Sequence, residues 1–173
     1  ILNENPTDLG KQNRWQQQIV CAANDDISEW MKLVHLVIDG FPHLNEKEYL
    51  YKLQEYIKNK RALILKDDDA AIGIMAFNEM TGNIDFLGIH PQYRKRGIAK
   101  AFCQKALYEL VHSSAISITT FREGDKADTG YRKSLKNIGF AEAELLVEFG
   151  YPTQRLILRK NCLEDHSEGI PHE

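Results

Sequence analysis

One stretch of the chain has residue types and spacing that suit the binding of an anion. Between Phe86 and Tyr108 there is no acidic residue but there are five basic ones, although the whole chain has a formal net charge of −3. The basic residues are Arg94, Lys95, Arg96, Lys100 and Lys105. A local excess of positive charge in a net-acidic protein attracts anionic ligands. This stretch is therefore the first candidate for a functional site.

The same stretch has the pattern of a strand followed by a helix, which would add backbone donors to those charges. A helical period starts near Gly97, directly after the basic residues. The first amides of a helix lack internal partners and lie at the positive end of its dipole, and Gly97 lets a ligand approach the backbone. These features predict a phosphate or pyrophosphate ligand. Neither GxxxxGK(S/T) nor GxGxxG occurs, so a triphosphate loop and a dinucleotide fold are not supported.

Hydrophobic periodicity defines the elements that must position this junction. Short apolar runs alternate with segments whose apolar residues recur at steps of three and four, as in strands and amphipathic helices respectively. The expected strands are Gln17–Ala22, Arg61–Lys66, Ala71–Asn78, Ile84–His90, Ala115–Phe121, Ala143–Phe149 and Gln154–Arg159. The expected helices begin at Asp26 and Asn45, each followed three residues later by a capping glutamate, and near Gly97 and Lys126. The order is β-α-α-β-β-β-α-β-α-β-β.

Length and composition predict a single globular domain. The chain has 173 residues, of which 43% are hydrophobic and 27% charged. Polar, turn-rich ends mark residues 1–14 as an N-terminal extension and residues 161–173 as a C-terminal tail, around a domain of residues 15–160. The longest nearly apolar run, Ala70–Phe77, is far shorter than the roughly 20 residues that cross a bilayer, so no membrane partner is expected.

The cysteine and histidine patterns bear on compartment and metal binding. The three cysteines are widely spaced and odd in number, which favours a cytoplasmic location over a disulfide framework. The six histidines form neither HxxxH nor HExxH, so no metal is expected. Cys103 lies on the apolar face of the helix that begins near Gly97, and we expect it in the core rather than as a nucleophile.

The junction resembles a known cofactor-binding signature. Arg94-x-x-Gly97-x-Ala99, preceded by Leu87-x-Ile89, is similar to the acyl-coenzyme A binding pattern Gln/Arg-x-x-Gly-x-Gly/Ala of the GNAT N-acetyltransferase family. Residues 135–140, which precede a strand, strengthen this resemblance, and it extends over residues 17–159 in element order. It implies an α+β fold with a mixed, mostly antiparallel central sheet and helices on both faces. The sheet would splay between the strands at 84–90 and 115–121.

The resemblance also implies a cosubstrate and its binding residues. The cosubstrate would be acetyl-CoA, with its pantetheine arm in the splay. The backbone groups of Leu87 and Ile89 would hold the pantetheine arm and the acetyl carbonyl. The pyrophosphate would be bound by the following loop and helix start, which comprise Arg94, Lys95, Arg96, Gly97, Ile98, Ala99 and Lys100.

The implied reaction is direct attack of a primary amine on the acetyl thioester. The amine must lose a proton, and the developing oxyanion needs a donor, for which the resemblance suggests the N–H of Ile89. Asp85 is the first candidate base because it lies on the strand that would flank the cofactor. Glu79 and Glu148 are alternatives, and each of these three carboxylates could instead be simply solvated.

The position that usually holds the proton-donating tyrosine departs from the family pattern. It is Leu135 here, whereas Tyr131 lies one helical turn earlier on the same face and could substitute or could simply pack. The alternative to an acetyltransferase is therefore a non-catalytic module that binds or senses acyl-CoA. Nucleic-acid binding is not expected, because the basic charge sits in one short segment of an acidic chain without an aromatic platform.

The sequence says less about the site that binds the acceptor amine. In the family it is formed by the loop between the first two helices and the connection between the last two strands, where the candidates are Phe41, His43 and Tyr151. Aromatic walls suit a cation or an apolar group. Small amines, amino acids, aminoglycosides, peptide N-termini and protein lysines all remain open. A homodimer is compatible with this architecture, although no sequence feature demands it.

Overall fold

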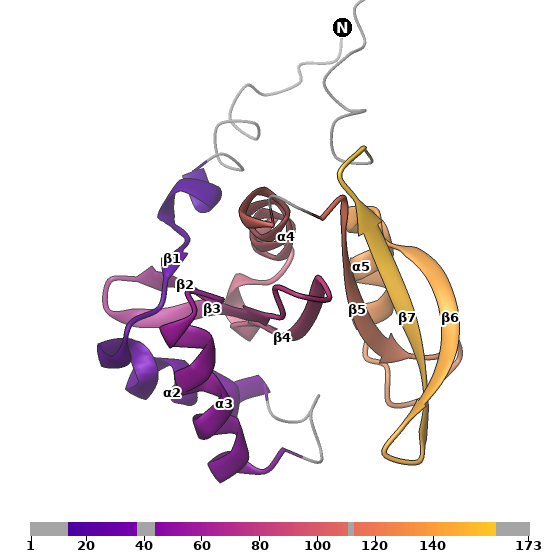
Figure 1. Cartoon of the computed structure of the whole chain (residues 1–173), viewed down its shortest axis with the longest axis horizontal. Helices are drawn as coiled ribbons and strands as arrows, with labels where there is room; N and C mark the ends of the chain where they lie inside the picture. Colours follow the sequence, from indigo (N-terminus) through magenta and orange to yellow (C-terminus); the bar gives the residue numbers. More distant parts are fainter. Residues whose placement is uncertain (1–13, 38–43, 111–112, 162–173) are drawn as a thin grey trace, which may run out of the picture.

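Within the residues that the computed structural model describes, which are 14–37, 44–110 and 113–161, seven strands form one mixed sheet (Figure 1). The strands lie in the order β1-β2-β3-β4-β5-β7-β6. All neighbours are antiparallel except β4 and β5, which are parallel. The strands are β1 Val20–Cys21, β2 Ala62–Asp67, β3 Ala70–Phe77, β4 Asn83–Ile89, β5 Ala115–Phe121, β6 Ala141–Glu148 and β7 Tyr151–Arg159.

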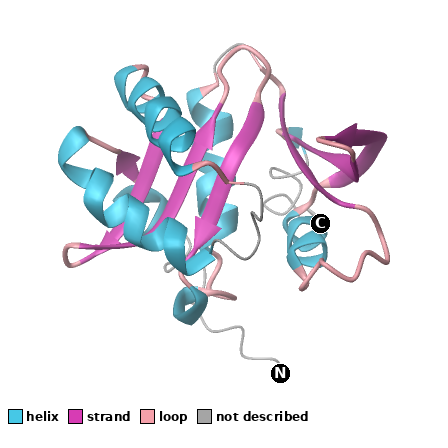
Figure 2. Ribbon diagram, turned by 90° about the horizontal axis from the view of Figure 1, so that it is seen from below, coloured by secondary structure: helices cyan, strands magenta, loops and turns pink. Residues whose placement is uncertain are grey.

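Helices cover both faces of this sheet, as Figures 1 and 2 show. They are α2 Ile27–Val37, α3 Glu46–Lys58, α4 Ile98–Glu109 and α5 Tyr131–Ile138, with the 3-10 turns η1 Asn24–Asp26 and η3 Pro91–Tyr93. The helices α2 and α3 pack on one face, and α4 and α5 pack on the other. The expected element order and the α+β class are confirmed.

Each face of the sheet has its own hydrophobic core. On one face, Trp30 of α2 and Leu53 of α3 pack against β2, β3 and β4. On the other face, Phe102 and Cys103 of α4 are buried together with Leu135 of α5. The helical period thus predicted the buried face of α4 correctly, including Cys103. These two cores hold the helices against the strands that carry the candidate site.

Short-range sequence signals set the start of α3 and α4. The side chain of Asn45 accepts hydrogen bonds from the amides of Lys47 and Glu48 at 3.2 and 3.4 Å, which confirms the predicted cap of α3. α4 begins directly after Gly97, whose φ is +79°. This left-handed conformation costs a residue with a Cβ about 1–2 kcal/mol, so glycine is the residue that fits there.

The expected first strand is mostly wrong. Residues 14–18 are helical, and the Ile19 amide donates to the Trp15 carbonyl at 3.1 Å, so only Val20–Cys21 pairs with β2. The expectation relied on the apolar run at the end of Gln17–Ala22. The glutamines before that run are better helix formers than strand formers, and Trp15 packs its ring on the core.

Two expected helix starts also differ from the structure. The helix expected from Lys126 begins at Tyr131, because Asp125 and Asp128 accept hydrogen bonds from amides two residues ahead and hold the chain in turns. Asp26 does not cap α2 but accepts the Ala23 amide at 2.8 Å and so caps the preceding 3-10 turn. In both places aspartate side chains favour turns over regular helix.

The sheet opens between β4 and β5. Only two pairs join these strands, Asn83 with Ser117 and Ile84 with Ile118, and beyond them the strands separate as the resemblance implied. The register of β3 with β4 also shifts at this point, since Phe77 pairs with Ile84 whereas Ala76 pairs with Phe86. The extra residue in β4 is Asp85, so it occupies a β-bulge at the point where β4 and β5 begin to separate.

Candidate functional site

Backbone groups of β4 face the opening. The His90 amide donates to the Ile72 carbonyl at 2.8 Å, so in this antiparallel ladder every second residue of β4 bonds to β3. Leu87 and Ile89 are the intervening residues, and their N–H and C=O groups point away from β3. The carbonyl of Ile89 accepts the Arg94 Nε at 3.4 Å. An extended ligand beside β4 could therefore bond to Leu87 and Ile89 as a further strand would.

A candidate anion site lies at the end of β4. The first helical bond of α4 runs from the Ala101 amide to the Gly97 carbonyl at 3.1 Å, which leaves the amides of Ile98–Lys100 without helical partners. Arg94, Lys95 and Arg96 are exposed in the preceding loop. In the described part of the chain none of them forms an ion pair with a carboxylate. Free amides and uncompensated cations at one helix start fit a diphosphate well.

Side chains from other parts of the fold hold this loop. The indole Nε1 of Trp15 donates to the Arg96 carbonyl at 3.2 Å. The Tyr93 hydroxyl donates to Asp67 at 2.5 Å, and this hydrogen bond raises the tyrosine pKa. The guanidinium of Arg96 lies over the Tyr93 ring at 4.9 Å. Nothing in the sequence analysis pointed to Trp15 or Asp67, because both are distant from the loop along the chain.

Asp85 lies on the face of α2 and α3, held by two donors. The Tyr56 hydroxyl of α3 donates to one carboxylate oxygen, and the side-chain Nδ2 of Asn83 donates to the other at 2.7 Å. Burial and the neighbouring Asp85 both raise the pKa of Tyr56, so it remains a donor. Tyr56 also lines an open pocket of about 510 Å³ between α3 and the β3–β4 turn. Asp85, the expected base, is therefore exposed to solvent but held by two hydrogen bonds.

Tyr131 lies on the opposite face of the sheet from Asp85. It packs against the core of α4 and α5, and burial, with Cys103 nearby, raises its pKa, so it is protonated at neutral pH. Leu135, at the usual tyrosine position, is only 1% exposed and belongs to the core. Burial raises the pKa of Cys103 to about 12, which leaves almost no thiolate at neutral pH.

The other two candidate carboxylates lie in different surroundings. Glu79 forms an ion pair with Arg61 at 2.5 Å and lines the same pocket beside α3 as Tyr56. Glu148 is at the end of β6, and β5 and β7 lie between that strand and β4. Glu148 is therefore separated from Asp85 by two strands, whereas Glu79 is paired with an arginine.

The structure describes one of the three acceptor-side candidates. Tyr151 begins β7, donates to Asp125 at 2.6 Å and makes an edge contact with Phe121 at 6.0 Å between ring centroids. This hydrogen bond lowers the pKa of Asp125 and raises that of Tyr151. Tyr151 is therefore attached to the end of β5, on one side of the opening. Phe41 and His43 lie outside the described residues.

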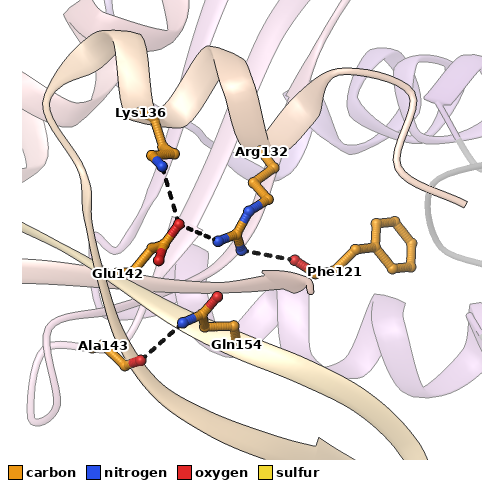
Figure 3. A network of polar contacts seen from close by, with 6 residues as sticks. All are labelled: Phe121, Arg132, Lys136, Glu142, Ala143 and Gln154. Carbon is orange, nitrogen blue, oxygen red and sulfur yellow. Dashed lines mark hydrogen bonds and ion pairs between the residues drawn. The ribbon is translucent and has the colours of Figure 1, made fainter. Parts of the chain in front are cut away.

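An ionic network around the buried Arg132 anchors that side, and sequence reasoning missed it (Figure 3). Arg132 of α5 is 5% exposed and donates to the Phe121 carbonyl at 3.1 Å and to Glu142 at 2.5 Å. Lys136 donates to the same carboxylate at 3.0 Å. The spacing of Arg132 and Lys136 by four residues places both on one helix face, which was the only available signal. The network joins α5 to the ends of β5 and β6.

No group of three or more histidine, cysteine, aspartate or glutamate side chains in the described residues has the proximity to hold a metal ion. No helix there is both long enough and apolar enough to cross a membrane.

A mixed sheet that opens between two parallel strands beside a helix start is the arrangement that the resemblance to acyl-CoA-dependent transferases implied. The chain belongs to the GNAT acetyltransferase family, since the family model "Acetyltransferase (GNAT) family" matches residues 30–135, more than half of its length. It is therefore a GNAT N-acetyltransferase, from a family that uses acetyl-CoA and acetylates amines. No curated protein sequence matches the chain.

Solved structures agree on the fold. A GNAT-family acetyltransferase from Bacillus cereus has a TM-score of 0.60 at 21% identity, covering 82% of this chain and 96% of that one. One from Streptococcus agalactiae has a TM-score of 0.63 at 16% identity, covering 83% and 95%. The PaiA N-acetyltransferase from Thermoplasma acidophilum, in complex with coenzyme A, has a TM-score of 0.60 at 15% identity, covering 82% and 97%.

Proposed function

We propose that this protein transfers the acetyl group of acetyl-CoA to a primary amine by direct attack in a ternary complex. The observation that carries the proposal is the opening between β4 and β5, with the backbone groups of Leu87 and Ile89 turned towards it and an anion site at its end. A linear ligand with a phosphate-bearing end and an amide-bearing arm suits this combination. Acetyl-CoA has both, and it supplies the acetyl thioester.

The residues at the junction fit that cosubstrate. Leu87 and Ile89 bond to the pantetheine amides, and the amides of Ile98, Ala99 and Lys100 bond to the diphosphate. Arg94, Lys95 and Arg96 add charge, and Gly97 keeps the approach to the backbone open. Two structures with the same fold, PaiA and an aminoglycoside 6'-N-acetyltransferase, are complexes with coenzyme A, which supports this assignment.

Three groups carry out the proton and charge transfers. Asp85 accepts the proton of the cationic amine, directly or through water. The Ile89 N–H donates to the oxyanion that develops on the acetyl carbonyl. Tyr131 keeps its proton because burial raises its pKa, and its hydroxyl donates a hydrogen bond to the leaving thiolate. Because Asp85 and Tyr131 lie on opposite faces of the sheet, the amine enters from one face and the hydrogen bond to the leaving group comes from the other.

The acceptor binds on the face of Asp85. Phe41, His43 and Tyr151 are the proposed walls, and the aromatic ring of Tyr151 suits a cation or an apolar group. Structural neighbours of the same fold include an aminoglycoside 6'-N-acetyltransferase and Ard1 from Thermoplasma volcanium. At 10–13% identity these neighbours share the fold alone, so all five acceptor classes go into the test.

The test is release of free CoA thiol from acetyl-CoA with an amine panel drawn from those classes. Asp85→Asn should lower kcat about 100-fold with an unchanged Kd for acetyl-CoA, because it removes the base and keeps the hydrogen-bonding shape. Asp69→Asn, at the exposed β2–β3 turn, is the matched control and should behave as wild type. Thiol release that is independent of Asp85 would remove it from the mechanism.

The second candidate function is an acyl-CoA sensor without turnover. It is favoured by Leu135, which fills the core where the family has its tyrosine. Micromolar binding of acetyl-CoA with no thiol release for any amine would support the sensor and reject the catalytic proposal.

A further inference from the structure

Asp85 has more support than an exposed carboxylate on a strand usually receives. A carboxylate side chain in water samples several rotamers, and holding it in one costs entropy. Here each oxygen has its own donor, Tyr56 from α3 on one and Asn83 from β4 on the other. A carboxylate has about four acceptor positions, so about two remain for a substrate amine or a water.

The Asn83 side of this arrangement is anchored to β5. The Ser117 hydroxyl donates to the Asn83 side-chain oxygen at 3.2 Å, which orients the amide so that its nitrogen faces Asp85. Asn83 and Ser117 are also the first of the two residue pairs that join β4 to β5. The orientation of Asp85 therefore depends on the point where the opening begins.

The Tyr56 side is anchored to the core of α2 and α3. Its ring is partly buried there, next to Tyr49, which accepts the Trp30 indole N–H at 2.8 Å. Burial and the hydrogen bond to Asp85 raise the pKa of Tyr56, so the phenol keeps its proton. The phenol is thus a fixed donor at working pH rather than a mobile or ionised group.

We propose that Tyr56 is a positioning residue for the transfer reaction, which fixes the Asp85 carboxylate so that its free lone pairs meet the incoming amine. Asn83 supplies the second point of attachment. The inference rests on the proposed role of Asp85 as base. It assigns to this chain a function for an α3 side chain that has no part in the cofactor signature.

A double-mutant cycle in the full chain tests this inference. Tyr56→Phe keeps the ring and removes the donor, so kcat should fall about tenfold with little change in the Kd for acetyl-CoA or the KM for the amine. In an Asp85→Asn background the same substitution should change kcat less than twofold, because its effect passes through Asp85. Tyr51→Phe, at an exposed position on the same helix, is the control and should leave both kcat and the melting temperature unchanged.

Two amine probes sharpen the kinetic result. Benzylamine is cationic at neutral pH and needs a base, whereas 2,2,2-trifluoroethylamine is largely neutral and does not. Tyr56→Phe should therefore slow benzylamine much more than trifluoroethylamine. A purely structural role would slow the acetylation of both amines equally, and that result would overturn the inference. An equal loss of kcat in the wild-type and Asp85→Asn backgrounds would overturn it as well.

A stability readout separates failure of this inference from failure of the proposed function. The melting-temperature losses of Tyr56→Phe and Asp85→Asn should be non-additive if the two side chains bond to each other. Additive losses overturn the inference whatever the activity. If the melting-temperature losses are non-additive but Asp85→Asn has the wild-type rate, the two side chains are in contact but Asp85 is not the base. The positioning role of Tyr56 is then rejected together with the role of Asp85.

Discussion

The cofactor side and the base side of this site are built in opposite ways. The cofactor side is one continuous segment, residues 87–100, in which backbone groups and neighbouring side chains face the same ligand. The base side joins Asp85 to Tyr56, 29 residues away, and Asn83 to Ser117, 34 residues away. A continuous segment leaves a pattern in the sequence, whereas distant contacts leave none. The two sides should therefore respond differently to substitution.

The difference extends to the chemistry each side uses. The cofactor side relies on backbone amides that any side chain leaves in place, so it is sensitive mainly to backbone conformation and to charge. The base side relies on particular side-chain donors around a bulge, so it is sensitive to the removal of a single atom. Four substitutions or measurements test this contrast.

The largest effect is expected at Gly97. Gly97→Glu combines a strained left-handed backbone with a carboxylate at the anion site, so acetyl-CoA binding should weaken at least 100-fold. Calorimetric titration measures this directly. Gly124→Glu is the matched control, because Gly124 has the same φ of +79° and open space around it, and binding should be unchanged. Equal losses in both variants would mean that backbone strain, not the anion site, is responsible.

Removal of Arg132 should have the next largest effect, on stability. Arg132→Met keeps an apolar stem but leaves the Phe121 carbonyl without its donor and Glu142 with Lys136 alone, so the free energy of unfolding should fall by about 2 kcal/mol. Chemical denaturation measures the loss. Arg155→Met, whose pair with Glu144 is half exposed, should lose less than about 1 kcal/mol. Similar losses would show that the network in Figure 3 is no stronger than a surface pair.

A smaller effect on binding is expected at Trp15, the distant residue that supports the cofactor loop. Trp15→Phe keeps an aromatic ring but removes the donor to the Arg96 carbonyl, so the Kd for acetyl-CoA should rise about fivefold. Trp30→Phe removes a comparable indole donor on the other face, and it should lower stability without changing that Kd. An unchanged Kd in Trp15→Phe would mean that the cofactor loop is self-sufficient, which would make the contrast between the two sides sharper.

No chemical modification of the Cys103 thiol is expected in the native protein. Its pKa of about 12 leaves about one thiolate in ten thousand molecules at pH 8, and burial blocks access to it. The thiolate fraction grows only as the pH rises towards that pKa. Iodoacetamide labelling followed by peptide mass spectrometry should therefore modify the exposed Cys21 and leave Cys103 free in the native protein. Acetylation or rapid alkylation of Cys103 would reopen the question of a covalent intermediate.

Sequence patterns succeeded where neighbouring residues decide the outcome. The cap at Asn45, the start of α4 after Gly97 and the buried face that includes Cys103 all depend on residues within a few positions of one another. The misses arose where a short-range pattern competed with a stronger contact. The helical segment before Val20 and the late start of α5 at Tyr131 follow from packing of Trp15 and from aspartate-held turns, which the hydrophobic period does not record.

The element order, the strand-to-helix junction from Leu87 to Lys100 and the family resemblance could all be predicted from the amino-acid sequence, because each depends on spacing along the chain. Three other features became visible only in the folded chain: β7 lies between β5 and β6, a bulge turns Asp85 towards α3, and Tyr56 and Asn83 hold its carboxylate. These features depend on strand register and on packing between distant helices. A shift of one residue in register turns a side chain to the other face, and the local sequence carries little information about that choice.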